Sequence, residues 1–226
     1  LEEHPDEELV RRHERQIFPL LRRRVLFAGV DDFRLYDFFA AHGADENVVA
    51  FSNLCDKERS LVVFHNRFAA TSGWIRLSAA FAAEDPFGAP RRLRQEDLGR
   101  GLGLRDEPGW YVVFRDQVSG LEYIRSCREL CARGMFFELA AYQTHVFIDF
   151  RELADDDGGR LAALESVLQG RGVASVEAAC RELELRPLHA ALGEMCRSEL
   201  ADRFAAVLQA APGGMAENAL WLELEA

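Results

Sequence analysis

Lysine is almost absent from this sequence of 226 residues. Of its 27 basic side chains, 26 are arginines and only Lys57 is a lysine, while acidic side chains number 38 and give a formal net charge of −11. A chain this acidic repels nucleic acids and anionic membranes unless its basic residues are gathered in a patch. The first 30 residues carry six arginines but also six acidic side chains. We therefore expect neither a nucleic-acid partner nor a membrane.

Cysteine is scarce and odd in number. The five cysteines, at positions 55, 127, 131, 180 and 196, cannot all pair in one chain, and none has CxxC or zinc-site spacing. We expect free thiols in a reducing compartment, hence a cytoplasmic protein. No apolar run approaches the roughly 18 residues of a membrane span, and no signal peptide is present. Leu rather than Met at position 1 suggests a piece of a longer polypeptide.

Residues 6–24 carry apolar side chains at helical spacing, with acidic residues at the start and arginines at the end, as suits the helix dipole. The apolar stripe consists of Leu9, His13, Ile17, Leu20 and Leu21. Pro19 removes a backbone donor inside this pattern, so we expect a kink or a restart near Phe18.

Between residues 33 and 150 the pattern changes to short runs rich in β-branched and aromatic residues, separated by polar or glycine-bearing turns. The runs cover residues 33–39, 47–53, 60–66, 73–81, 110–116, 121–126, 135–140 and 144–150. Short connections indicate antiparallel neighbours. Residues 82–109, rich in proline, glycine and charge, predict a long excursion with one short helix.

After Phe150 the chain becomes rich in alanine and leucine at helical spacing, following a linker or N-cap in DDDGG (residues 155–159). The final NALWLELEA fits a helix or a strand. The sequence thus predicts an α+β protein: an antiparallel β-sandwich of about eight strands with an N-terminal helix and a C-terminal helical extension. The expected divisions are residues 1–24, 25–150 and 151–226.

Histidines and glycines stand in no recognisable ligand pattern. The glycines of GRGLGL, at positions 99, 101 and 103, lack a preceding strand and a following Lys-Ser/Thr, so a mobile loop is favoured over a nucleotide site. His65 and His145 lie at strand ends that an antiparallel sheet can bring together, but no third ligand is in register. We predict no metal and no cofactor.

Acids, serines and thiols likewise predict no catalytic residue. Asp45–Glu46 and Asp155–Asp157 are paired carboxylates in turns, where carboxylates are normally solvated, whereas a glycosidase needs one buried acid beside an ionised partner. No serine stands in GxSxG. Cys127 and Cys131 fall on one helical face without an activating histidine nearby in sequence. Chemistry within this chain is not expected.

Aromatic residues lie in or beside several strands, and most are expected in the core. Trp74 and Trp110 each follow a glycine at the beginning of a strand, which places them at the rim of a sandwich. Because exposed aromatic rings stack on sugars, we take Trp74 and Trp110 as the candidates for carbohydrate contact.

The order of motifs over residues 6–150 resembles the junction between the last barrel helix and the C-terminal β-sandwich of α-amylase family glycoside hydrolases. The motifs are FPLLRRR with its Pro19-Leu20-Leu21, a strand VLFAGV, then FRLYDFF, VVAFSN and SLVVFHN. Ser52 and Asn53 depart from the family's usual arginine in the fourth motif. The segments GWIRLSAAF and YVVFRDQVSGLEYIRS further resemble large, multidomain bacterial amylase-like proteins.

The resemblance implies a non-catalytic region that packs on an upstream catalytic barrel of the same polypeptide, with contact to α-glucan left open. The family's catalytic aspartate, glutamate and His-Asp pair belong to barrel strands, so none carries over to this chain, and the isolated fragment is expected to be inactive. The alternative is an independent β-sandwich module for binding or protein interaction. A helix stripe made for an absent barrel also leaves open a homodimer through residues 6–24.

Overall fold

The computed structural model describes residues 6–83, 92–195, 202–203 and 205–206. The chain divides into two compact units, residues 1–177 and residues 178–226. The second unit includes the helical residues from Ala178 to Met195, which belong to α7 (Val176–Met195). No described helix is long and apolar enough to cross a membrane. NALWLELEA and Cys196 lie outside the described residues.

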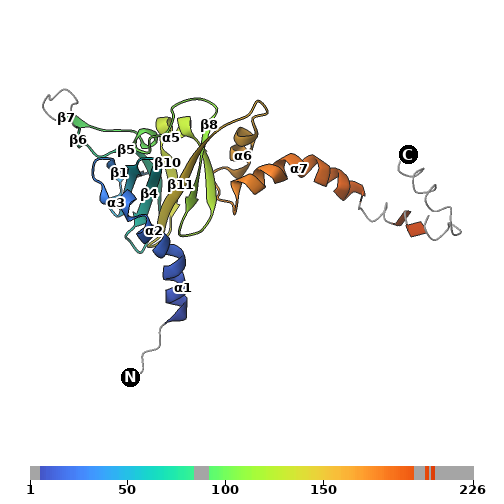
Figure 1. Cartoon of the computed structure of the whole chain (residues 1–226), viewed down its shortest axis with the longest axis horizontal. Coiled ribbons are helices and arrows are strands. Elements are labelled where there is room, and N and C mark those ends of the chain that lie inside the picture. The colour runs from blue at the N-terminus through green and yellow to red at the C-terminus, as the bar shows by residue number, and fades with distance from the viewer. Residues whose placement is uncertain (1–5, 84–91, 196–201, 204, 207–226) are drawn as a thin grey trace, which may run out of the picture. The chain divides into compact units, whose positions relative to one another are not determined.

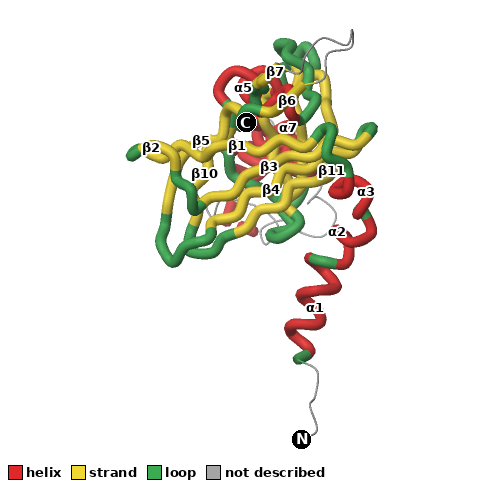
Figure 2. The backbone as a smooth tube through the Cα atoms, turned by 90° about the vertical axis from the view of Figure 1, so that its left-hand side faces the viewer, coloured by secondary structure: helices red, strands yellow, loops and turns green. Residues whose placement is uncertain are grey.

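One antiparallel sheet dominates the first unit (Figure 1). It contains nine strands in the order β10-β5-β1-β3-β4-β11-β8-β9, with β2 paired to β1. They are β1 (Phe33–Ala40), β2 (Gly43–Ala44), β3 (Val48–Cys55), β4 (Glu58–His65), β5 (Thr71–Ser78), β8 (Trp110–Asp116), β9 (Glu122–Ser126), β10 (Met135–Leu139) and β11 (Thr144–Ala154). The sheet curls into a half-barrel (Figure 2), and this confirms the predicted α+β class with antiparallel, sandwich-like strands. All eight expected runs are strands, because each alternates side chains between two faces.

The core lies inside the curl, where side chains from facing parts of the sheet meet. Phe114 packs edge-on against Phe147 with ring centroids 5.1 Å apart and stacks on Phe150 at 5.1 Å. The largest fully buried apolar side chains that the strands contribute to this core are Phe38, Leu61, Val63, Ile75, Phe114, Leu139 and Phe147. The helix α5 (Cys127–Arg133) adds the buried Cys127, Leu130 and Cys131 to this layer.

The N-terminal segment forms three consecutive helices, α1 (Glu7–Gln16), α2 (Phe18–Arg22) and α3 (Arg24–Ala28). Asp6 caps α1 by accepting from the backbone N–H groups of Glu8 and Leu9 at 3.0 and 3.1 Å. The helix breaks at Ile17, as Pro19 predicts, and Pro19 sits in the first turn of α2 where its missing N–H costs little.

The segment VLFAGV is a helix where a strand was expected. Residues of α3 continue the helical run and bury Leu26 against β3 and β4, near the turn that joins them. An apolar run of five or six residues fits a short buried helix as well as a strand, so its sequence alone does not separate them.

The excursion between β5 and β8 contains a hairpin of β6 (Phe81–Ala83) and β7 (Arg92–Arg94), followed by the expected short helix, α4 (Leu98–Gly101). The prediction of a mobile loop at GRGLGL is wrong. Gly99 and Gly101 are buried in α4, and a Cβ at either position would collide with Cys131 Sγ or with Tyr36 Oη. These glycines permit close packing rather than motion.

The described residues after β11 are mainly helical, as predicted. Asp155 accepts from the backbone N–H groups of Leu161 and Ala162 at 2.8 and 3.0 Å, so it satisfies the free donors at the beginning of α6 (Arg160–Leu168). The helix α7 runs from Val176 to Met195 and continues through Pro187.

Candidate binding surfaces

The outer face of the sheet carries uncovered apolar side chains over β1, β3 and β4, whereas over β8, β9 and β11 it is buried, with Val113, Ile124 and Ile148 at most 1% exposed. Leu35 on β1, Phe51 on β3 and Val62 on β4 stand side by side in register. Leu35 and its neighbours Phe33 and Val49 are 44%, 39% and 42% exposed. In Figure 2, β1, β3 and β4 lie in front, and no described helix crosses them. We call these five residues the outer apolar face; antiparallel sheets with one solvated face normally carry polar side chains there.

A row of three aromatic side chains extends this face toward the β10 edge. Trp74 on β5 lies opposite Phe39 on β1 and Phe136 on β10, so the three rings share one line across three strands. Their exposures are 38%, 47% and 44%, and the Trp74 and Phe136 rings are 5.3 Å apart. The Arg133 guanidinium lies 5.7 Å from the Trp74 ring. This aromatic row borders a shallow pocket of about 540 Å³ that also includes Arg76 and Leu77.

Trp110, the second candidate for sugar contact, occupies a different environment. It begins β8, which is five places from β5 in the sheet, and it is half-buried against the core. The Arg105 guanidinium lies 4.0 Å from its ring centroid and covers one ring face. Trp74 therefore offers the more accessible ring, and the structure does not bring the two tryptophans together.

The half-barrel is open between its two edge strands, β9 and β10. A cleft of about 420 Å³ lies at this seam, with Trp74 and Phe136 on one side and Tyr123 and Arg125 on the other. His145 lines its interior. The Arg125 guanidinium donates to the carbonyl oxygens of Ile124 and Gly170 at 2.7 and 2.8 Å, and burial lowers its pKa.

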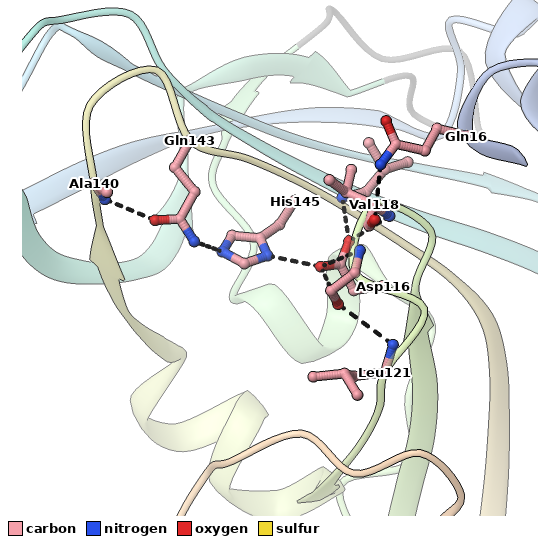
Figure 3. Close-up of polar contacts among 9 residues, drawn as sticks. Gln16, Asp116, Val118, Leu121, Ala140, Gln143 and His145 are labelled. Carbon is pink, nitrogen blue, oxygen red and sulfur yellow. Dashed lines mark hydrogen bonds and ion pairs between the residues drawn. The ribbon is translucent and has the colours of Figure 1, made fainter. Parts of the chain in front are cut away.

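A buried polar chain runs behind the seam (Figure 3). Nδ1 of His145 is 3.0 Å from the Asp116 carboxylate, and its Nε2 is 2.9 Å from the Gln143 amide nitrogen. Asp116 also accepts from the Ser119 hydroxyl at 2.8 Å and from the Val146 N–H at 3.1 Å. Burial alone would raise the pKa of Asp116, but these hydrogen bonds together outweigh burial and lower it.

The hydrogen-bonded network of Gln143, His145 and Asp116 supports the fold rather than nucleophilic catalysis. Both ring nitrogens of His145 are engaged, and the Ser119 hydroxyl donates to Asp116 instead of facing the imidazole. A nucleophile–base pair needs the hydroxyl within hydrogen-bond reach of the base. Asp116 instead holds the β8–β9 turn, whose Val118 carbonyl accepts from the Gln16 side chain at 2.9 Å and so fixes the end of α1.

The two histidines considered together in the sequence have separate partners. His65 is buried, and its Nδ1 is 2.9 Å from the Ala140 carbonyl oxygen, whereas His145 binds Asp116. Among the described residues, no group of three or more His, Cys, Asp or Glu side chains is placed to hold a metal ion.

The carboxylate pairs are occupied by local hydrogen bonds. The expectation that Asp45 is solvated is wrong: it is buried and accepts from the Asn47 side chain at 2.8 Å and the Thr71 hydroxyl at 2.9 Å. These bonds, the Asn47 contribution being the largest, lower the pKa of Asp45. Asp155 caps α6, so neither pair presents the free acid and partner of a glycosidase.

The described cysteines, at positions 55, 127, 131 and 180, are thiols. Burial raises the pKa of the Cys127 thiol to about 12 and that of Cys131 to about 11, so neither ionises readily at neutral pH. This agrees with their interpretation as structural residues rather than nucleophiles.

Sequence reasoning missed Phe39, Phe136 and Asp116. Phe39 and Phe136 fall in predicted strands, but only cross-strand register shows that they flank Trp74. Asp116 ends a strand before QVSG, a position typical of a turn aspartate, and nothing in the sequence places it beside His145. Comparisons of the chain with protein-family models, with curated proteins and with solved structures gave no match.

Proposed function

We propose that this chain is a non-catalytic accessory region of an α-amylase family glycosidase, and that its outer apolar face and N-terminal helices support a catalytic barrel in the same polypeptide. The observation that carries the proposal is the exposed apolar surface of a sheet whose other face already forms the core. Such surfaces in a folded domain mark sites of contact with another domain. The resemblance in the order of motifs along residues 6–150 points to a barrel as that domain, although VLFAGV forms a helix where the resemblance implies a strand.

The helices present a second uncovered apolar surface. Leu9, Ile17 and Leu21 are 50%, 41% and 60% exposed, and no residue of α1 or α2 is buried. The end of α1 is nevertheless held to the sheet, because Gln117 donates to the Arg15 carbonyl at 2.6 Å and Gln16 to that of Val118 at 2.9 Å. The stripe is therefore anchored but unpartnered among the described residues.

Covering this stripe would be worth a substantial free energy. These three aliphatic side chains are already about half-buried, so covering the rest would contribute roughly 2–5 kcal/mol before ordering entropy is subtracted. Either a barrel of the same polypeptide or a second copy of this chain would supply such a cover. A homodimer through the helix remains the alternative for the isolated chain.

The coding sequence upstream of Leu1 tests the proposal most simply. We expect an α-amylase-type barrel in the same reading frame; an unrelated domain, or none, would favour the independent binding module. The purified chain should release no reducing sugar from starch or maltodextrin, because it lacks an acid–nucleophile pair. Turnover that survives purification and disappears in Asp45→Asn or Glu46→Gln would overturn the proposal.

The aromatic row favours contact with α-glucan as an added role. Three exposed rings in line provide a flat surface on which sugar rings stack. Affinity electrophoresis in maltodextrin gels tests this: retardation should be lost in Trp74→Ala and kept in Trp110→Ala, the matched control. Equal retardation of both variants would remove the aromatic row as the sugar surface.

A further inference from the structure

A third pocket, separate from the aromatic row and the seam, gathers positive charge in a strongly acidic chain. It has a volume of about 430 Å³ and lies on the first unit, where α2 and α3 stand beside β4 and β11 (Figure 2). Its charged lining residues are Arg23, Lys57, Glu58, Arg59, Arg115, Glu122, Asp149 and Arg151. Five cations thus face three carboxylates. Adding Glu152, which pairs with Arg59 from outside the pocket, still leaves an excess of positive charge.

Two of the arginines share one carboxylate oxygen. Arg115 and Arg151 both donate to Oε1 of Glu122, at 3.3 and 3.1 Å. The other oxygen of Glu122 accepts from the backbone N–H of Val176 at 2.9 Å, so this buried carboxylate is fully engaged. Each guanidinium has five N–H donors in a planar fork, and the side chains of Arg115 and Arg151 are 47% and 60% exposed. Donors therefore remain available on both.

Lys57 adds a further donor, whereas Arg59 is already engaged. The Nη2 atom of Arg59 donates to the Gly103 carbonyl oxygen and to Glu152 at 3.0 and 2.9 Å. Its Nε is buried away from solvent, so a ligand in the pocket does not reach it. Lys57, in the turn between β3 and β4, has no ion pair within the described part of the chain, although it lines the same pocket.

The backbone is bent at this point. Asp149 has φ of +58° and lies in a β-bulge, where the register of β11 against β8 shifts between Ile148 and Arg151. A non-glycine residue in this conformation is strained, and strain of this kind gathers at ligand sites. The bulge lets Asp149 pair with Arg23 at 2.6 Å, which holds the α2–α3 junction against the pocket.

From these observations we infer that the pocket binds a small oxyanion of the phosphate class, held by the guanidinium groups of Arg115 and Arg151 with Lys57 as an additional donor. Planar guanidinium forks match the oxygens of phosphate and form charge-assisted hydrogen bonds with them. The inference does not depend on the proposed accessory role, since it uses neither the outer apolar face nor the helix stripe.

Lys57 provides a direct probe, because it is the only lysine in the chain. Reductive methylation with ¹³C-formaldehyde keeps its charge and labels one side chain, with the α-amine as an internal reference. Titration of the whole chain with inorganic phosphate at low ionic strength should move the Lys57 signal along a saturating curve and leave the reference unmoved. The same titration with glycerol 3-phosphate, and with glycerol as a control, shows whether the pocket prefers a phosphate ester or the free ion.

Variants give the test its specificity. Arg115→Gln and Arg151→Gln should each weaken phosphate binding about ten-fold, the loss expected for one charge-assisted hydrogen bond. Arg128→Gln, which removes the same charge from the exposed side of α5, should bind as the wild type does. Lys57→Gln removes a pocket charge without disturbing Glu122 and should also weaken phosphate binding, as measured by calorimetry. It keeps the inference testable if the arginine variants do not fold.

An absent or non-saturating shift in the wild type would overturn the inference. Equal weakening in Arg128→Gln, or none in any pocket variant, would reduce the effect to non-specific screening and would overturn it as well. Neither result would bear on the reading frame upstream of Leu1, so the proposed function and the oxyanion site fail separately.

Discussion

The inner face of the sheet and its outer face over β1, β3 and β4 carry similar apolar side chains, but the inner ones are buried and the outer ones are exposed. On the inner face Leu61 and Phe114 are each 1% exposed, whereas on the outer face Leu35 and Phe33 are 44% and 39% exposed. Burial within the described chain therefore explains the inner face and the outer face over β8, β9 and β11, but not the outer face over β1, β3 and β4. We propose that a partner domain covers this exposed part, and the difference is the physical basis of the proposed accessory role.

The two faces also differ in how tightly their side chains are packed. Inner residues are fixed by packing on every side, so truncation leaves a cavity that the structure only partly fills. Outer residues already contact water on one side, so the same truncation removes little. Substitutions matched across the two faces therefore measure the difference directly.

The largest effect is expected for a phenylalanine pair. Phe114→Ala should lower the free energy of unfolding by about 3–5 kcal/mol, through lost transfer energy and a cavity. Phe33→Ala, on the outer face, should cost less than about 1 kcal/mol in the isolated chain. Denaturant unfolding with a common m-value measures both, and equal losses would contradict the assignment of the two faces.

A glycine pair tests how α5 closes the inner face. Gly134 turns the chain from α5 into β10 with φ of +76°, and a Cβ there would collide with the Ile75 carbonyl oxygen. Gly109 has φ of +77°, but a Cβ added there would meet nothing within 4 Å. Gly109→Ala should therefore cost only the backbone strain of about 1–2 kcal/mol, and Gly134→Ala clearly more. Thermal melts that rank them the other way would show that α5 does not press on β5.

The buried Asp116 should make part of the inner-face stability depend on pH. Its pKa is lowered in the folded state, so its contribution is present above the unfolded pKa of about 4 and is lost as pH falls through the folded pKa. Asp116→Asn should be less stable than wild type at pH 7 by about 1–3 kcal/mol, with the gap shrinking below pH 4.

The control for this substitution is Asp37→Asn, at an exposed position of β1. It should change stability little at either pH. A constant gap between wild type and Asp116→Asn from pH 7 to pH 3 would mean that the carboxylate is not what holds the β8–β9 turn.

The smallest effect concerns the thiols. In the folded chain, Cys127 and Cys131 should react with a thiol reagent at neutral pH more slowly than the half-buried Cys55, because both are buried and have a raised pKa. In denaturant without reductant all five cysteines should titrate. Peptide mapping of the labelled protein would reveal the order of reaction, and fewer than five thiols after unfolding would indicate disulfides.

Strands were predictable because alternation and turn residues are local properties. The eight runs expected between residues 33 and 150 are all strands, and Pro19 marks the helix break. The α3 helix was not predictable, since five apolar-rich residues fit either structure. Gly99 and Gly101 were misjudged because glycine permits motion and close packing alike, and only the contact with Cys131 or Tyr36 separates the two.

The candidate surfaces depend on register, which the sequence does not state. Trp74 was identified as an exposed ring, but its neighbours Phe39 and Phe136 come from strands distant in sequence. The sharing of Glu122 by Arg115 and Arg151 likewise requires the bulge at Asp149. Charge counting over the whole chain hides such a local excess, because the net charge is −11.

Hydrogen exchange of α1 and α2 tests the central claim most directly. Their amides should be compared between this chain alone and the polypeptide read from the same frame with the region upstream of Leu1, with β11, which lies outside the outer apolar face, as the internal reference. If the apolar stripe docks on a barrel, exchange over residues 7–22 should slow by at least about ten-fold in the longer polypeptide, since opening the helix then requires undocking it. Unchanged exchange in α1 and α2 would contradict the accessory role.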